Sequence, residues 1–270
     1  MLKQISLAVL GCFLSSNALA GAKFELNSIA GEIVMKAQMV YYGENVDPAM
    51  AAKATDEIQG LWSGQSFRPG EASHPLKVKV GAGNYALRAE VTYVIVTLAE
   101  AQALANTNTD PSVNFIRFRK GGMPGDRSYY HSLGANSGVF YETDGIGTST
   151  TTAHEFGHGL GLDHPSNFDW RKLGRPAIMC PRGTIVEAQY QWNPKAQAGA
   201  SGGTMNPIWR LVSQWDVDNV GIDKLTFDAS GNAWVGYATN DIETSPVSFS
   251  IEYFRAFYEG LFFEPGFLNP

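Results

Sequence analysis

Cysteines, basic clusters and long apolar runs are all scarce in this sequence. The 270 residues include two cysteines, and 20 Lys+Arg stand against 26 Asp+Glu for a net charge of −6. Without a dense basic run, the chain has no electrostatic footprint for nucleic acid, and we expect no nucleic-acid partner. No segment reaches the roughly 18 consecutive apolar residues that a membrane-spanning helix needs. The length suits one large domain with a substantial core.

The first twenty residues have the pattern of a secretory signal. Lys3 gives a cationic start, residues 5–14 are apolar, and Ala18-Leu19-Ala20 is a small-residue cleavage site. An N-terminal helix of the domain is one alternative, and a lipid anchor on Cys12, after Val9-Leu10-Gly11, is another. We favour cleavage and release, which predicts a secreted or periplasmic protein. Cys180 is then the last cysteine of the chain, so no internal disulfide can form.

Three of the five histidines fall within eleven residues, in the segment HEFGHGLGLDH that begins at His154. His154 and His158 are four residues apart, so on a helix they lie on one face and can bind the same metal ion. Gly161 can adopt the positive φ that ends a helix sharply, which would bring His164 back to the metal. The segment matches H-E-x-x-H-x-x-G-x-x-H throughout, and we predict these three histidines as metal ligands.

Three neutral imidazoles leave one position of a tetrahedral zinc ion open, which is typical of catalytic sites. Glu155 follows the first ligand and can reach a water molecule at the open position, so we predict it as the general base. Two alternatives remain. The histidines could pack in a helix without metal, or Cys180 could close a purely structural zinc site as fourth ligand.

At this point the sequence resembles the metzincin clan of zinc endopeptidases, and within it the matrix metalloprotease branch. The resemblance rests on the histidine motif and on Ala177-Ile178-Met179-Cys180-Pro181, which is similar to the Met-turn of the clan, with Met179 beneath the metal. It implies an α+β fold in which a twisted mixed sheet with a backing helix precedes the zinc-site helix. The Met-turn and a C-terminal helix follow. It also implies zinc as cofactor and an extended protein or peptide as substrate, and we expect a monomer.

Some positions depart from the branch. Pro165 follows the third histidine where matrix metalloproteases usually have serine, and Cys180 stands in place of their usual tyrosine. The stretch between His164 and Met179 is also longer. Pro181 occupies the place of the transition-state tyrosine of the astacin and serralysin branches, so we assign no such role here.

The rest of the chain fits the implied layout. Asp47 and Pro48 have the residue types of a helix start, and Ser213 with Asp216 is similar to a capping box before a helix that runs towards Val220. The predicted helices span 49–62 and 213–220. Strands are predicted over 32–42, 76–80, 86–97, 114–119 and 137–143.

Several further features are interpreted more simply. We predict that Ser137 to Tyr141 forms the edge strand over the cleft and pairs with substrate, although a plain surface strand is an alternative. Asp228 to Asn232 indicates a hairpin turn between strands 225–227 and 233–237, with structural Ca²⁺ as a weaker alternative. His74 and His131 are expected to be surface or hydrogen-bonded residues; a second metal site is the alternative. Cys180 is expected to be a small buried residue.

The predicted organisation is a signal peptide over 1–20, a zinc metalloprotease domain over 21–240, and an aromatic-rich extension over 241–270. In that extension Phe249, Tyr253 and Phe257 recur every fourth residue, which indicates a helix packed on the domain. The predicted function is a secreted zinc endopeptidase. The alternative from another class is a non-catalytic zinc-stabilised binding module or surface lipoprotein, and a metallo-amidase acting on cell-wall peptides is a narrower one.

Overall fold

The structure is a computed structural model that describes residues 21–44, 46–66, 68, 70–121, 123 and 125–245. The predicted signal peptide and the predicted helix around Phe249, Tyr253 and Phe257 lie outside these residues. Within the described part, four α-helices and one mixed, curled sheet of eight strands form an α+β fold. In that same part, no helix combines the length and the apolar character needed to cross a bilayer.

The elements come in a mixed order along the chain. The strands are β1 (Ala22–Asn27), β2 (Glu32–Gly43), β3 (Lys77–Val80), β4 (Gly83–Ile95), β5 (Val113–Arg119), β6 (Tyr129–Tyr130), β7 (Ser137–Tyr141) and β8 (Asn232–Val235). The helices are α1 (Pro48–Trp62), α2 (Leu98–Thr107), α3 (Thr151–Gly159) and α4 (Gln214–Val220).

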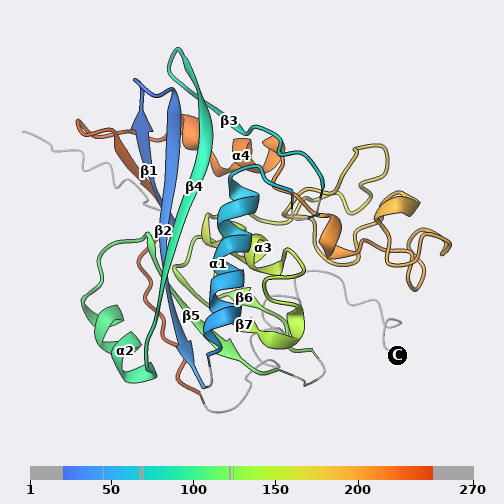
Figure 1. Cartoon of the computed structure of the whole chain (residues 1–270), viewed down its shortest axis with the longest axis horizontal. Coiled ribbons are helices and arrows are strands. Elements are labelled where there is room, and N and C mark those ends of the chain that lie inside the picture. The colour runs from blue at the N-terminus through green and yellow to red at the C-terminus, as the bar shows by residue number, and fades with distance from the viewer. Residues whose placement is uncertain are drawn as a thin grey trace, which may run out of the picture.

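The long strand β2 organises the sheet. It pairs in parallel with β4 along one side; on its other side β1 pairs antiparallel with its first half and β5 in parallel with its second half. Beyond β5 the strand order continues through β7 to β6, and at the opposite end of this order β3 lies beside β4. Figure 1 shows β2 and β4 as the two longest arrows, with α1 running along them.

The two faces of the sheet are covered by different helices, because successive side chains of a strand point to opposite faces. Met39 and Tyr41 of β2 belong to the main core, which includes residues of α1 and α3. Val40 and Tyr42 belong to a second cluster formed with α2. Figure 1 accordingly places α2 on the side of the sheet away from α1. The histidine motif therefore lies on the face that α1 covers.

Both predicted helix starts are confirmed. The Asp47 side chain accepts a hydrogen bond from the amide of Ala49 (2.8 Å), and Pro48 is the first residue of α1. Ser213 and Asp216 form the reciprocal capping box at the start of α4. These residues satisfy amide groups that have no partner within the first helical turn. The predicted strands over 32–42, 76–80 and 114–119 are found as β2, β3 and β5, with small shifts at their ends.

The prediction that Ser137 to Tyr141 forms the edge strand is wrong. The strand exists as β7, but β5 pairs with one side of it and the short strand β6 with the other. Gly138 makes this approach possible, since a Cβ there would overlap the carbonyl of Tyr129. All five residues of β7 are buried, and β6 stands at the end of the strand order instead.

The predicted hairpin over 225–237 is only partly correct. The turn is present, because the Asp228 carboxylate accepts hydrogen bonds from the amides of Ser230 (2.8 Å) and Asn232 (2.9 Å). Residues 225–227, however, are not a strand, and β8 pairs with β1. Leu225 and Phe227 are partly buried against the main core, so this segment is held by side-chain packing and not by the predicted strand pairing. Helix α2 and strands β1 and β6 were not predicted, and 86–97 ends as a strand at Ile95.

Candidate metal centre

The three predicted ligands come together at the end of α3. His154 and His158 lie one turn apart on this helix, and Gly161 follows with a φ of 88°, in the left-handed region that glycine adopts without steric cost. The chain turns there and returns His164 to the other two. The potential ligand atoms of the three residues all lie within 4.8 Å of one another. Among the described residues, they form the one group of this kind.

Backbone carbonyls orient two of the rings. Nδ1 of His154 contacts the carbonyl oxygen of Ile178 (2.6 Å), and Nδ1 of His158 contacts that of Leu162 (2.8 Å). A carbonyl oxygen only accepts hydrogen bonds, so each Nδ1 carries the proton and donates it. The lone pair is then on Nε2, which is the atom available for a metal.

The distance between two of the Nε2 atoms fits a tetrahedral ion. Nε2 of His154 lies 3.2 Å from Nε2 of His164. Two nitrogens bound to zinc at about 2.0–2.1 Å in tetrahedral geometry are roughly 3.3 Å apart. The two rings are also nearly parallel, with an interplanar angle of 22°, while His158 meets His164 at 71°. The residues present therefore fit a small divalent metal ion held by three imidazoles.

The electrostatic environment keeps these imidazoles neutral. Burial lowers the pKa of His154 well below its usual value and also lowers that of His158. Burial, followed by the neighbouring His158, lowers the pKa of His164 to about 4. Neutral imidazole is the form that binds a metal, so the site is ready to bind an ion near neutral pH without losing protons.

Glu155 lies on the same helix and is 8% exposed. Burial raises the pKa of its carboxyl well above the usual range, and the guanidinium of Arg210 opposes this rise. Arg210 is itself buried; its Nε donates to the hydroxyl of Thr150 (3.0 Å) and its Nη1 to the carbonyl of Cys180 (3.2 Å). A buried cation whose charge acts on the proposed base was not predicted, because Arg210 is more than fifty residues away in sequence and belongs to no motif.

Met179 packs at Gly157 against α3, which we call the metal helix because it carries two of the three histidines. A Cβ at Gly157 would overlap the sulfur of Met179, so the glycine between the two helical histidines is needed for this contact. The carboxylate of Asp216 in α4 stabilises the turn at Met179, because it accepts hydrogen bonds from the amides of Ile178 (3.2 Å) and Met179 (3.3 Å).

The remaining histidines and the cysteine lie elsewhere. His74 contacts the carbonyl of Val212 (2.7 Å), and His131 contacts the hydroxyl of Ser137 (3.0 Å), so both are hydrogen-bonded as predicted. Cys180 is fully buried with Trp170 and Val186, and burial raises the pKa of its thiol to about 12. It is not part of the histidine group in the described chain, so a closed site with Cys180 as fourth ligand gains no support.

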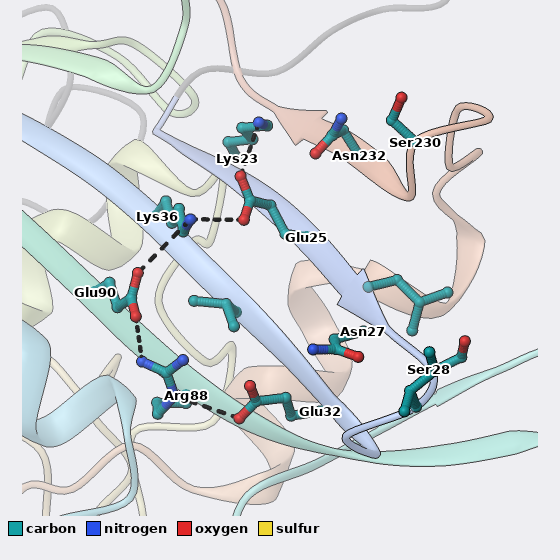
Figure 2. A pocket seen from close by; sticks show the side chains of 13 residues that line it. Lys23, Glu25, Asn27, Ser28, Glu32, Lys36, Arg88, Glu90, Ser230 and Asn232 are labelled. Carbon is teal, nitrogen blue, oxygen red and sulfur yellow. Dashed lines mark hydrogen bonds and ion pairs between the residues drawn. The ribbon is translucent and has the colours of Figure 1, made fainter.

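A surface depression of about 720 Å³ lies away from the histidines, on the sheet face opposite α1. Figure 2 shows that its charged side chains come from β1, β2 and β4 and alternate in sign. Lys36, for example, contacts Glu25 (2.6 Å) and Glu90 (3.7 Å). Exposed pairs of this kind contribute about 0–1 kcal/mol each, and their charges neutralise one another. We therefore assign no binding role to this depression.

No family model matches the chain, and a search of curated proteins gives no match. The resemblance to metzincins thus rests on the histidine motif and the Met179 turn. The structure supports a buried group of three histidines that could hold a metal ion.

Proposed function

We propose that the protein is a secreted zinc endopeptidase. The observation that carries the proposal is the convergence of three histidines, with one potential ligand nitrogen of each within 4.8 Å of the others. In two of the rings, a carbonyl oxygen accepts the Nδ1 proton and leaves Nε2 available for the metal. A structural site usually closes with a fourth protein ligand, often cysteine, and the described residues place no such ligand in the group. Zinc is the ion that a tetrahedral three-imidazole site with an open position suits best.

Glu155 supports a catalytic role over a purely structural one, because a structural metal site needs no carboxylate beside its first ligand. A bound zinc ion would supply Lewis acidity and lower the pKa of a water molecule at the site. The Glu155 carboxylate takes a proton from the attacking water and later gives it to the leaving amine.

The substrate we propose is a peptide in extended conformation. Because β7 is covered, the strand that borders the site is β6, at the end of the strand order. It lies next to the metal helix, since the ring of Tyr130 packs where a Cβ at Gly159 would stand. An extended peptide that adds to this edge by main-chain hydrogen bonds would run alongside α3.

Glu155→Gln tests the proposal. Removing the general base should lower peptide cleavage by about 10²- to 10⁴-fold while zinc stays bound at one equivalent. His158→Ala is the matched variant that should lose both zinc and activity. Cleavage is measured on a proteome-derived peptide library, with peptidoglycan offered in parallel to separate an amidase. A wild-type protein that binds stoichiometric zinc and cleaves neither substrate would contradict the proposal and favour a zinc-stabilised binding module.

A further inference from the structure

The metal helix α3 begins without an ordinary cap. Thr150, the residue before it, has a φ of 62° and makes no side-chain capping bond in the described chain. Its hydroxyl instead donates to the carbonyl of Pro207 (2.7 Å). The first amide groups of a helix have no partner within the helix, and burial without a partner costs about 1–3 kcal/mol for each group. The start of α3 is buried, so another part of the chain must provide acceptors.

Glu57 of α1 provides them. A single oxygen of its carboxyl, Oε1, accepts from the amide of Thr152 (2.8 Å), the hydroxyl of Thr152 (2.6 Å) and the amide of Ala153 (3.2 Å). Glu57 is 2% exposed, and its other oxygen has no hydrogen-bond partner within the described residues. An acidic group at a helix N-terminus is also favoured by the helix dipole.

A second residue of α1, Trp62, also binds the first turn of α3. Nε1 of Trp62 donates to the carbonyl of Ala153 (3.1 Å), and its ring meets Phe156 edge to face. The peptide groups on both sides of Ala153 are therefore bound to α1. Ala153 directly precedes His154, so these contacts with α1 lie one residue from the first proposed ligand and two from Glu155.

A buried carboxylate needs a reason to be there. Burial raises the pKa of Glu57, which means that the ionised form is disfavoured at this position. Apolar residues would pack α1 on α3 without this penalty, whereas only an acceptor can fix the amides at 152 and 153.

We propose that Glu57 is a positioning residue that fixes the start of the metal helix and thereby the direction of the His154 ring. This inference rests on the proposed metal site and deepens it. Outer contacts that orient metal ligands typically change metal affinity by about 10- to 100-fold when they are removed. The role depends on hydrogen-bond acceptance at one oxygen rather than on charge.

Three variants test the role. Glu57→Ala removes the acceptor and should weaken Zn²⁺ binding at least about tenfold. Glu57→Gln keeps one carbonyl oxygen for the three bonds and should bind Zn²⁺ close to the wild-type affinity. Thr55→Val is the matched control on the same helix: it removes the bond between the Thr55 hydroxyl and Tyr41 (3.1 Å), which lies in the sheet-facing core. It should lower the free energy of unfolding without changing Zn²⁺ affinity.

The measurements are Zn²⁺ affinity by competition with a chelator, the visible spectrum of the Co²⁺-loaded protein, and urea unfolding of the metal-free protein. A changed Co²⁺ spectrum in Glu57→Ala, restored in Glu57→Gln, is the expected signature. Equal Zn²⁺ affinity in Glu57→Ala and wild type would overturn the role of Glu57. So would an equal loss of affinity in Glu57→Ala and Thr55→Val.

If Glu57→Ala does not fold, Glu57→Leu decides, because leucine fills the space of the side chain but offers no acceptor to the amides of Thr152 and Ala153. Weaker Zn²⁺ binding in that variant supports the positioning role, and unchanged binding overturns it. A wild-type protein that binds no Zn²⁺ would overturn the metal centre itself. A wild-type protein that binds Zn²⁺ without cleaving peptides would overturn the proposed activity, while the affinity comparison still tests Glu57.

Discussion

At the scale of single residues, Asp216 has two tasks. Its carboxylate caps α4 through Ser213 and also accepts from the amides of Ile178 and Met179, so it joins the last helix to the turn beside the metal helix. Asp216 is fully buried, and burial raises its pKa from 3.8 to about 6 in spite of these hydrogen bonds. Ionisation of this one group therefore opposes folding near neutral pH.

The raised pKa predicts a specific pH dependence. A carboxyl whose pKa is higher in the folded state contributes stability that is present below its unfolded pKa and lost as the pH rises through the folded value. Asp216→Asn does not titrate. Between pH 4 and pH 7 the free energy of unfolding of the wild type should therefore fall relative to this variant by about 2 kcal/mol. The free energies of unfolding of both proteins are measured by urea unfolding in the presence of chelator. If they change in parallel with pH, the prediction is contradicted.

The group of three histidines was predictable because their spacing in the sequence is local. His154, His158 and His164 fall within eleven residues, and helical geometry with one glycine turn is enough to bring them together. Glu57 and Arg210 were not predictable in this way. Glu57 contacts the amide of Thr152 across 95 residues of sequence, and Arg210 contacts Thr150 across 60. No sequence spacing encodes such contacts, which depend on how distant parts of the chain pack against α3 and the residue before it.

At the scale of elements, the contact between α3 and the Met179 turn depends on a glycine. Alanine at position 157 would improve helix propensity by about 1 kcal/mol, but its methyl group would overlap the buried Met179 sulfur. Overpacking a tight core costs about 1–3 kcal/mol. We expect Gly157→Ala to lower the free energy of unfolding by about 1–2 kcal/mol, measured in urea.

Gly60 of α1 offers the matched control for this substitution. A Cβ there meets only the side chain of Gln65, at 3.2 Å, and that side chain can move. Gly60→Ala should therefore leave the protein as stable as the wild type, or more stable by up to about 1 kcal/mol. Equal effects of the two substitutions would show that Met179 does not restrict the side chain at position 157 of α3.

Elements with clear end signals were predicted, and pairing between distant strands was not. Helix α1 follows from Asp47 and Pro48, and α4 from its capping box. Helix α2 has the same signal in Thr97 and Glu100, but it directly follows a β-rich run and was overlooked. The edge position assigned to Ser137–Tyr141 failed for another reason. A strand of two residues, β6, covers it, and so short a strand leaves no periodic pattern in the sequence.

At the scale of the whole molecule, the metal should contribute to global stability. An ion that binds only the folded state stabilises it by about 4 kcal/mol at a free concentration 1,000 times its Kd. We expect excess chelator to lower Tm on the order of 10 °C, and added Zn²⁺ to restore it. Differential scanning calorimetry of the same preparation before and after chelation measures this.

The double variant His154→Ala/His158→Ala is the control for this experiment. It lacks two of the three proposed ligands, so its Tm should not respond to chelator or to Zn²⁺. A wild-type Tm that ignores both reagents would contradict a metal bound to these histidines. A response that persists in the double variant would place the metal elsewhere.

The contact between α1 and α3 also sets an order of events during folding. The three histidines are close to one another along the chain, so a still unfolded chain can already bind an ion loosely. Glu57 and Trp62 reach Thr152 and Ala153 across 91 to 96 residues, and contacts of such length form slowly because a long loop must close first. Tight binding should therefore mature late in refolding. An ion bound early would stay weakly bound until α1 packs on α3. During that interval the bound ion would exchange with metal ions in solution.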